Sequence, residues 1–172
     1  MEIFAKRRNN FPNKILFIGL LTLFFFSCDR SKIYEKYESI PNAVWNTNDP
    51  VKFDFEVKDT TQLCNLLINI RCSDNYPYRN LYMFMKTTQP DGKRAIDTLE
   101  FYLLDLKGKP LGNCSGDVCN NRFMVDHDFK FPLPGKYEFE LQHMMRIEDG
   151  SGNLPMIMDV GMRLEKATKK IQ

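Results

Sequence analysis

The chain has 172 residues, of which 43% are hydrophobic and 27% are charged, and its 24 Lys and Arg against 22 Asp and Glu give a formal charge of +2. This length suits one domain with a short appendage and excludes a large multidomain enzyme. Four of the basic residues precede the first hydrophobic run, so the rest of the chain is nearly neutral and lacks the basic surface expected of a nucleic-acid-binding protein.

The first predicted element is a secretory signal peptide at residues 1–27. Its apolar run, Ile15–Phe26, contains no charge and follows a basic stretch. As a helix this run would be ~18 Å long, well short of a membrane hydrocarbon core of ~30 Å. A buried core helix is the alternative, but no polar face accompanies the apolar one. The pattern therefore predicts a signal peptide rather than a membrane-spanning helix.

The residues at the end of the apolar run predict a lipid anchor. Ser27-Cys28 resembles the bacterial lipobox, in which the signal is cut before a cysteine whose thiol then carries diacylglycerol. Phe25 and Phe26 are bulkier than the usual residues of this motif, and an ordinary signal peptide with a chance cysteine is the alternative. We expect diacylglycerol and an N-acyl chain on Cys28 and no other cofactor. Surface-exported lipoproteins often carry an acidic cluster after this cysteine, and its absence here favours a domain that faces the periplasm. We expect the anchor in the outer membrane.

Residues 28–50 are polar and show no sustained periodicity, which predicts a lipidated tether and an irregular lead-in. From Val51 onward, apolar and polar residues alternate in four segments, as is typical of half-buried strands. These segments are Val51–Val57, Leu99–Leu103, Tyr137–Leu141 and Met158–Leu164.

Two further runs, Leu66–Ile70 and Leu81–Met85, are apolar on both faces and are expected in the middle of a sheet or beneath a covering segment. Turn signals rich in Pro and Gly separate the runs. The pattern predicts an all-β fold, an antiparallel β-sandwich or jelly roll formed by residues 51–166, followed by a frayed tail at 167–172.

Four cysteines besides Cys28 allow several pairings. Cys114 and Cys119 flank a short loop and are the preferred disulfide pair, because disulfides persist in exported proteins. Cys64 and Cys72 would lie ~26 Å apart on one extended strand. They would therefore need a turn between them to bond, and free thiols are the alternative. The cysteine spacings do not match those of zinc sites, and we expect no metal.

Aromatic residues near the start of the domain suggest a binding surface. Trp45 precedes the first clear strand, and Tyr76 and Tyr78 share a predicted loop. Such rings stack on sugar faces, so a module that binds cell-envelope glycans is an alternative function. The competing interpretation is that Trp45 closes one end of the sandwich, since tryptophan is usually buried.

Catalytic motifs are scarce. His127 lies between two aspartates, which suggests a hydrolase that uses Cys114 or Cys119 as nucleophile and His127 as base. No nucleophile elbow or other acyl-transfer motif accompanies these residues. We therefore predict that the protein is not an enzyme.

Short motifs follow one another from about Tyr34 to Lys166. They include Trp45-Asn46, Asp59-Thr60-Thr61, Tyr76-Pro77-Tyr78, Asp97-Thr98-Leu99, Phe131-Pro132-Leu133-Pro134-Gly135 and Met158-Asp159-Val160-Gly161. In this order, and together with Ser27-Cys28, they resemble the GldH family of Bacteroidota gliding-motility lipoproteins. The resemblance implies an envelope lipoprotein of the gliding apparatus, linked to type IX secretion, with Cys28 as the lipid attachment point and no known catalytic chemistry.

These observations together predict a non-catalytic, lipid-anchored accessory protein of the gliding and secretion machinery. Its expected partners are other envelope lipoproteins or membrane proteins, together with the membrane that holds its lipid. Trp45, Tyr76 and Tyr78 are the residues expected on its interaction surface.

Overall fold

A computed structural model of the protein describes residues 29–167, which form strands and one 3₁₀ turn but no α-helix. In chain order the elements are β1 (Lys32–Ser39), η2 (Pro41–Ala43), β2 (Val44–Asn46), β3 (Val51–Val57), β4 (Cys64–Ser73), β5 (Asn80–Thr88), β6 (Arg94–Tyr102), β7 (Asn113–Ser115), β8 (Val118–Phe129), β9 (Gly135–His143), β10 (Asn153–Pro155) and β11 (Ile157–Lys166).

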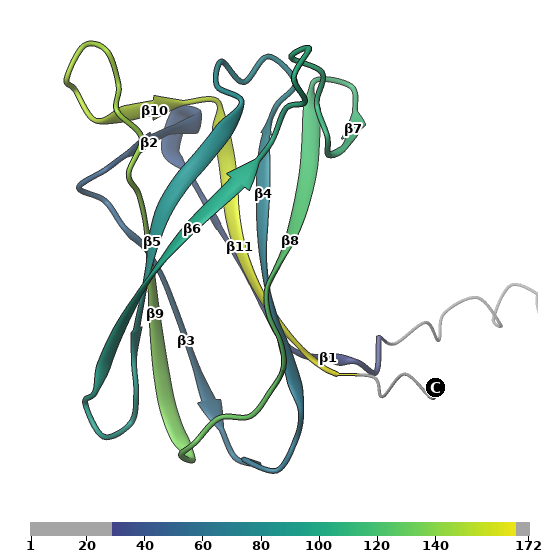
Figure 1. Ribbon diagram of the computed structural model, residues 1–172, viewed down its shortest axis with the longest axis vertical. Coiled ribbons are helices and arrows are strands. Elements are labelled where there is room, and N and C mark those ends of the chain that lie inside the picture. Colours follow the sequence, from purple (N-terminus) through teal and green to yellow (C-terminus); the bar gives the residue numbers. More distant parts are fainter. Residues whose placement is uncertain (1–28, 168–172) are drawn as a thin grey trace, which may run out of the picture. The chain divides into compact units, whose positions relative to one another are not determined.

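The strands form an antiparallel sandwich (Figure 1). One sheet has five strands in the order β1-β11-β4-β8-β7, and the other has four in the order β3-β9-β5-β6. A short ribbon of β2 and β10 lies across one end (Figure 1). The all-β sandwich predicted from the sequence is confirmed.

Strands β3 and β9 show why the sequence pattern works. In β3 the side chains alternate strictly between buried and exposed, beginning with buried Val51. Strand β9 buries Tyr137, Phe139 and Leu141 in the same way, and the register sets Phe139 opposite Phe53. Because successive side chains point to opposite faces of a strand, the apolar residues of both strands face the other sheet.

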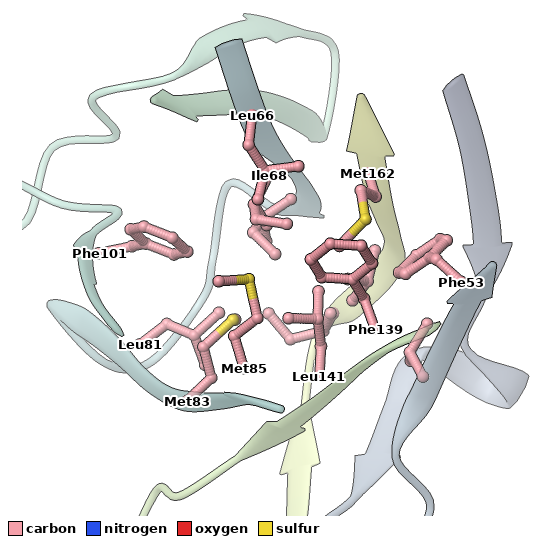
Figure 2. Close-up of a cluster of buried hydrophobic side chains, with 14 of the residues drawn as sticks. Phe53, Leu66, Ile68, Leu81, Met83, Met85, Phe101, Phe139, Leu141 and Met162 are labelled. Atoms are coloured by element: carbon pink, nitrogen blue, oxygen red, sulfur yellow. The ribbon is translucent and has the colours of Figure 1, made fainter. Parts of the chain in front are cut away.

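The core lies between the two sheets and is rich in methionine and aromatic residues (Figure 2). Met83 and Met85 of β5, Ile68 of β4 and Met162 of β11 all lie in this layer. Each fully buried side chain of this size contributes ~1.5–3 kcal/mol to folding, so the contact between the sheets is the main source of stability.

The segment before Val51 differs from the predicted tether and irregular lead-in. Residues 32–39 form β1, which pairs along its length with β11, and the compact unit begins at Ser31 rather than at Val51. The prediction failed because β1 is an edge strand whose side chains are exposed or half-buried on both faces. Main-chain hydrogen bonds hold such a strand, and charged side chains are common on sheet edges.

The two ends of the chain are only partly covered by the structure. The predicted signal peptide, residues 1–27, and the predicted lipid site, Cys28, lie outside the described residues. The predicted frayed tail begins at Ala167, but its N–H donates to the Leu63 carbonyl at 2.9 Å, so order extends to this residue. Residues 168–172 also lie outside the described part.

One strand departs from its predicted alternation. In β11 a bulge between Ile157 and Asp159 shifts the register, so Ile157 is buried where the pattern predicted Met158. Buried Arg163 of the same strand points to the other face, where its Nε lies 2.9 Å from Glu165 and its Nη1 lies 3.3 Å from Glu35 of β1. Ion pairs therefore cover the outer face of this strand.

Candidate interaction surface

Trp45, expected on the interaction surface, is buried. It is 1% exposed, its indole N–H donates to the Asp49 carbonyl at 3.0 Å, and its ring meets His143 edge-on at 5.2 Å. Leu154, fully buried, is its partner across the β2–β10 ribbon. The prediction of a stacking surface was wrong for Trp45, which instead closes the end of the sandwich.

Tyr76 is also buried, and this part of the predicted surface was wrong as well. Its hydroxyl donates to the Asn80 carbonyl at 3.1 Å, and burial raises the pKa of Tyr76 far above its usual value. Tyr78 is half-buried, with its ring 5.8 Å from that of Tyr76. Loops at the ends of a sandwich must cover the open ends of the core, and large aromatic rings do so here. The glycan-binding alternative thereby loses two of its three rings.

The cysteines divide into a bonded pair and two free thiols. A disulfide joins Cys114 of β7 to Cys119 of β8. Gly112, just before β7, lets the chain pass close to β8, because a Cβ at that position would lie 2.7 Å from the Asn120 carbonyl oxygen. Cys64 and Cys72 are free and buried at opposite ends of β4, which stays extended between them.

The cysteine–histidine hydrolase is not assembled. His127 is exposed near the end of β8, and its Nδ1 lies 3.4 Å from Oδ2 of Asp128, which is also exposed. Cys119 lies eight residues away on the same strand, which is ~26 Å at ~3.3 Å per residue. Both candidate nucleophiles are also consumed by the disulfide.

An exposed aromatic cluster appears instead on the outer face of β5 and β6. We call it the tyrosine patch and define it as Arg79, Asn80, Tyr82, Glu100 and Tyr102. The register sets Tyr82 opposite Glu100 and Asn80 opposite Tyr102, so these four side chains point to one face. Tyr82 is 40% exposed and Tyr102 is 42% exposed.

One hydrogen bond and the charge of Glu100 link the side chains of the tyrosine patch. The Asn80 amide donates to Glu100 Oε1 at 2.8 Å. This bond, followed by the influence of the nearby tyrosine hydroxyls, lowers the pKa of Glu100, and the carboxylate in turn raises the pKa values of Tyr82 and Tyr102. The Arg79 guanidinium lies 4.5 Å from the centre of the Tyr102 ring, a cation–π distance.

The sequence contained a signal for this patch that the prediction did not use. Tyr102 falls on the polar side of the predicted alternation around Leu99–Leu103, and Tyr82 lies in a run that is apolar on both faces. Strand β5 does lie in the interior of its sheet, between β9 and β6. The exposed Tyr82 side chain shows, however, that its outer face is not fully covered.

The described part of the chain offers neither a metal site nor a membrane span. No group of three or more His, Cys, Asp or Glu side chains among residues 29–167 is arranged to hold a metal ion. In the same residues we find no helix of sufficient length and apolar character to cross a membrane. These residues define a class of protein, an antiparallel β-sandwich domain that presents a tyrosine-rich face.

Comparison with known proteins identifies the family. The sequence model of the family described as "GldH lipoprotein" matches residues 32–164. The chain is 36% identical over 156 residues to the "Gliding motility lipoprotein GldH homolog" of Christiangramia forsetii, covering 88% of this chain and 95% of that protein. It is 33% identical over 153 residues to the "Gliding motility lipoprotein GldH" of Flavobacterium johnsoniae, covering 86% and 92% respectively.

The chain therefore belongs to the GldH family of gliding-motility lipoproteins, as its sequence motifs predicted. Membership in a lipoprotein family implies a lipid-anchored protein of the cell envelope.

Proposed function

We propose that this protein is a non-catalytic accessory component of the gliding machinery and of the linked type IX secretion system. It acts through contacts with other envelope lipoproteins or membrane proteins and binds no nucleic acid. The observation that carries this proposal is the tyrosine patch, an exposed and hydrogen-bonded group on the outer face of the four-stranded sheet.

The composition and order of the patch suit a protein interface. Tyrosine and arginine are enriched among the residues that dominate binding energy at interfaces. Ordering a flexible side chain on binding costs ~0.5–1.5 kcal/mol, and tyrosine, with only two side-chain torsions, is ordered at low cost. The Arg79 guanidinium over the Tyr102 ring and the hydrogen bond from Asn80 to Glu100 further restrict the patch before binding.

The anchor in this proposal is lipid on Cys28, in the outer membrane, with the domain in the periplasm. Each buried CH₂ group contributes ~0.8 kcal/mol, so two or more acyl chains hold a protein stably on a bilayer. A Cys28→Ala variant should leave the membrane fraction and lose its detergent-phase partitioning. Unchanged partitioning of this variant would contradict lipidation without touching the role of the tyrosine patch.

The contact is tested by photo-cross-linking in intact cells of a gliding host. A photoreactive residue replaces Tyr102 in one strain and Tyr37 in another. Tyr37 is a matched control, because it is 43% exposed but lies on β1 of the other sheet. We expect an adduct with a protein of the gliding or secretion machinery from position 102 and none of that mass from position 37. Identical adducts from both positions, or none from either, would refute the assigned surface.

A functional assay tests the role of the contact. The host gene is deleted and replaced by wild type, by the Tyr82→Ala/Tyr102→Ala variant or by Tyr37→Ala, and surface spreading and protein secretion are both measured. We expect the double variant to reach the envelope at wild-type level yet spread and secrete poorly, while Tyr37→Ala behaves as wild type. Full activity of the double variant would remove the tyrosine patch from the proposal.

A further inference from the structure

Three cysteines lie in one row across neighbouring strands of the five-stranded sheet. The register sets Cys119 of β8 opposite Cys114 of β7 on one side and opposite Cys72 of β4 on the other. Residues directly opposite in an antiparallel ladder share a face and have Cα atoms ~4.5 or ~5.5 Å apart. The Cα atoms of the bonded pair, Cys114 and Cys119, lie 3.9 Å apart, and the ladder spacing expected for Cys72 and Cys119 lies within the ~4.4–6.8 Å that disulfides usually span. Cys119 therefore has a suitable bonding partner on each side.

The structure contains one of these two possible disulfides, and the third cysteine is a free thiol. Cys114 and Cys119 form the disulfide, and Cys72 is free. The Cys72 Sγ lies 4.0 Å from the Cys119 carbonyl oxygen and 3.5 Å from the Asn121 side-chain nitrogen. Because Asn121 and Cys119 are two residues apart on β8, their side chains share one face. The Cys72 thiol therefore lies over the strand face that carries Cys119.

We propose that Cys72, Cys119 and Cys114 form a thiol–disulfide exchange site in which Cys72 and Cys114 compete for Cys119. The Cys72 thiolate attacks Sγ of Cys119, and the Cys72–Cys119 bond forms as the Cys114–Cys119 bond breaks. Cys114 leaves as a thiolate and takes up the proton that Cys72 has lost. One disulfide and one thiol exist before and after, so the step consumes no oxidant and no reductant.

The row arrangement favours this step, and burial limits its rate. Cys119 lies between the other two cysteines along the row. The sulfur of Cys72 therefore attacks Cys119 from the side opposite the leaving sulfur of Cys114. Burial raises the pKa of Cys72 to about 11, which leaves little thiolate at neutral pH and makes attack slow. The forward exchange should therefore be slow, and the present form should persist long enough to be isolated.

Exchange changes the surface chemistry of the protein. In the present form the free thiol is the buried Cys72, whereas after exchange it is Cys114, which is exposed on the short edge strand β7. Only a three-residue ladder would then pair β7 with β8. An accessible thiol of this kind reacts with disulfides of other proteins and with thiol reagents. Cys114 is thus the residue through which the site would meet a disulfide-bearing partner.

The experiment traps the released thiol. The folded domain is incubated with N-ethylmaleimide at pH 8 for several hours, then unfolded without reductant, digested and mapped by mass spectrometry. We expect slow modification of Cys114 together with a Cys72–Cys119 disulfide in the same molecules. Modification of Cys72 alone, with Cys114–Cys119 intact throughout, would overturn the proposal.

Two serine variants identify the attacking thiol. Cys72→Ser should abolish the modification of Cys114, because nothing remains to displace it. Cys64→Ser removes the other buried free thiol, at the far end of β4, and should leave the rate unchanged. Modification of Cys114 at the wild-type rate in Cys72→Ser would show that the Cys114–Cys119 bond opens without Cys72, and would refute the role of Cys72.

A third variant tests the geometry independently of the rate. Cys114→Ser replaces an exposed side chain, so it should fold, and it leaves Cys72 and Cys119 as neighbours. Mild oxidation with glutathione disulfide should then give a Cys72–Cys119 disulfide in the folded domain. If both thiols stay reduced or are only glutathionylated, the two cysteines do not reach one another and the proposal fails.

Discussion

Two groups of aromatic residues in this protein differ in burial, and in each group the burial is the opposite of what the sequence suggests. Trp45 and Tyr76 lie beside predicted loops, yet they are buried at the margins of the core. Tyr82 and Tyr102 lie inside strands, yet they are the exposed rings of the tyrosine patch. Burial thus follows which face of an element meets the other sheet, and it does not follow whether the residue is in a loop or a strand.

The comparison separates residues that hold the fold from residues that are free to bind. The buried group forms hydrogen bonds to main-chain carbonyls, as those of Trp45 with Asp49 and Tyr76 with Asn80 show. The exposed rings lie beside Glu100, which accepts a hydrogen bond from Asn80 of the same patch. Substitution of the first group should therefore change stability, and substitution of the second should leave stability almost unchanged.

The largest expected effect is that of Trp45→Ala. Truncating a buried tryptophan removes its apolar contacts and leaves a cavity, which costs ~3–5 kcal/mol. Urea unfolding of the domain should show this loss. Val44→Ala is the matched control, since Val44 precedes Trp45 on β2 but is exposed, and it should stay within ~0.5 kcal/mol of wild type. If Trp45→Ala does not fold, Trp45→Phe should fold and show a smaller loss of stability. Wild-type stability of Trp45→Ala and of Trp45→Phe would contradict the structural role of Trp45.

Some strands of this fold could be predicted from the sequence, and others could not. Strict alternation predicted β3 and β9 correctly, because a strand with one buried and one exposed face alternates apolar and polar residues. Strand β1 shows no such alternation, since its place depends on main-chain hydrogen bonds to β11, more than a hundred residues away. The tyrosine patch likewise depends on the β5–β6 register and on the outer face of β5 remaining uncovered. Neither condition can be deduced from one strand alone.

The second prediction concerns His143, whose ring meets that of Trp45 and is fully buried. Burial lowers the pKa of His143 below its ordinary value near 6.5. Below pH ~6.5 the unfolded chain therefore binds a proton that the folded chain rejects, and stability falls with pH by at most ~1.4 kcal/mol per unit. Stability is restored as the pH rises above ~6.5, where both states hold a neutral ring.

Urea unfolding at pH 7 and at pH 5 measures this effect. His143→Phe should flatten the change between the two pH values, because the ring that titrates is gone. His127→Gln is the control, since His127 is exposed, and it should keep the wild-type slope. An unchanged slope in His143→Phe would assign the pH dependence to other groups.

A smaller effect is expected from Tyr76→Phe, which removes one hydroxyl and little volume. The buried hydroxyl donates to the Asn80 carbonyl at 3.1 Å, and loss of such a bond costs ~0.5–1.5 kcal/mol. Tyr82→Phe also removes a tyrosine hydroxyl, but Tyr82 is 40% exposed, so water can solvate the polar groups left at the surface. The midpoint temperature of thermal unfolding should therefore be lower for Tyr76→Phe than for Tyr82→Phe. The reverse order would contradict the distinction between the buried and the exposed aromatic group.

The smallest expected effect on stability is that of Tyr82→Ala and Tyr102→Ala. Both rings stand on the outer face of the four-stranded sheet, and exposed substitutions usually change the free energy of unfolding by no more than ~0.5 kcal/mol. Urea unfolding of each single variant should give a midpoint close to wild type, with an unchanged dependence on urea concentration. A loss above ~2 kcal/mol from either variant would mean that the ring supports the sheet. In that case a loss of partner binding could no longer be attributed to the surface, because the fold itself would have changed.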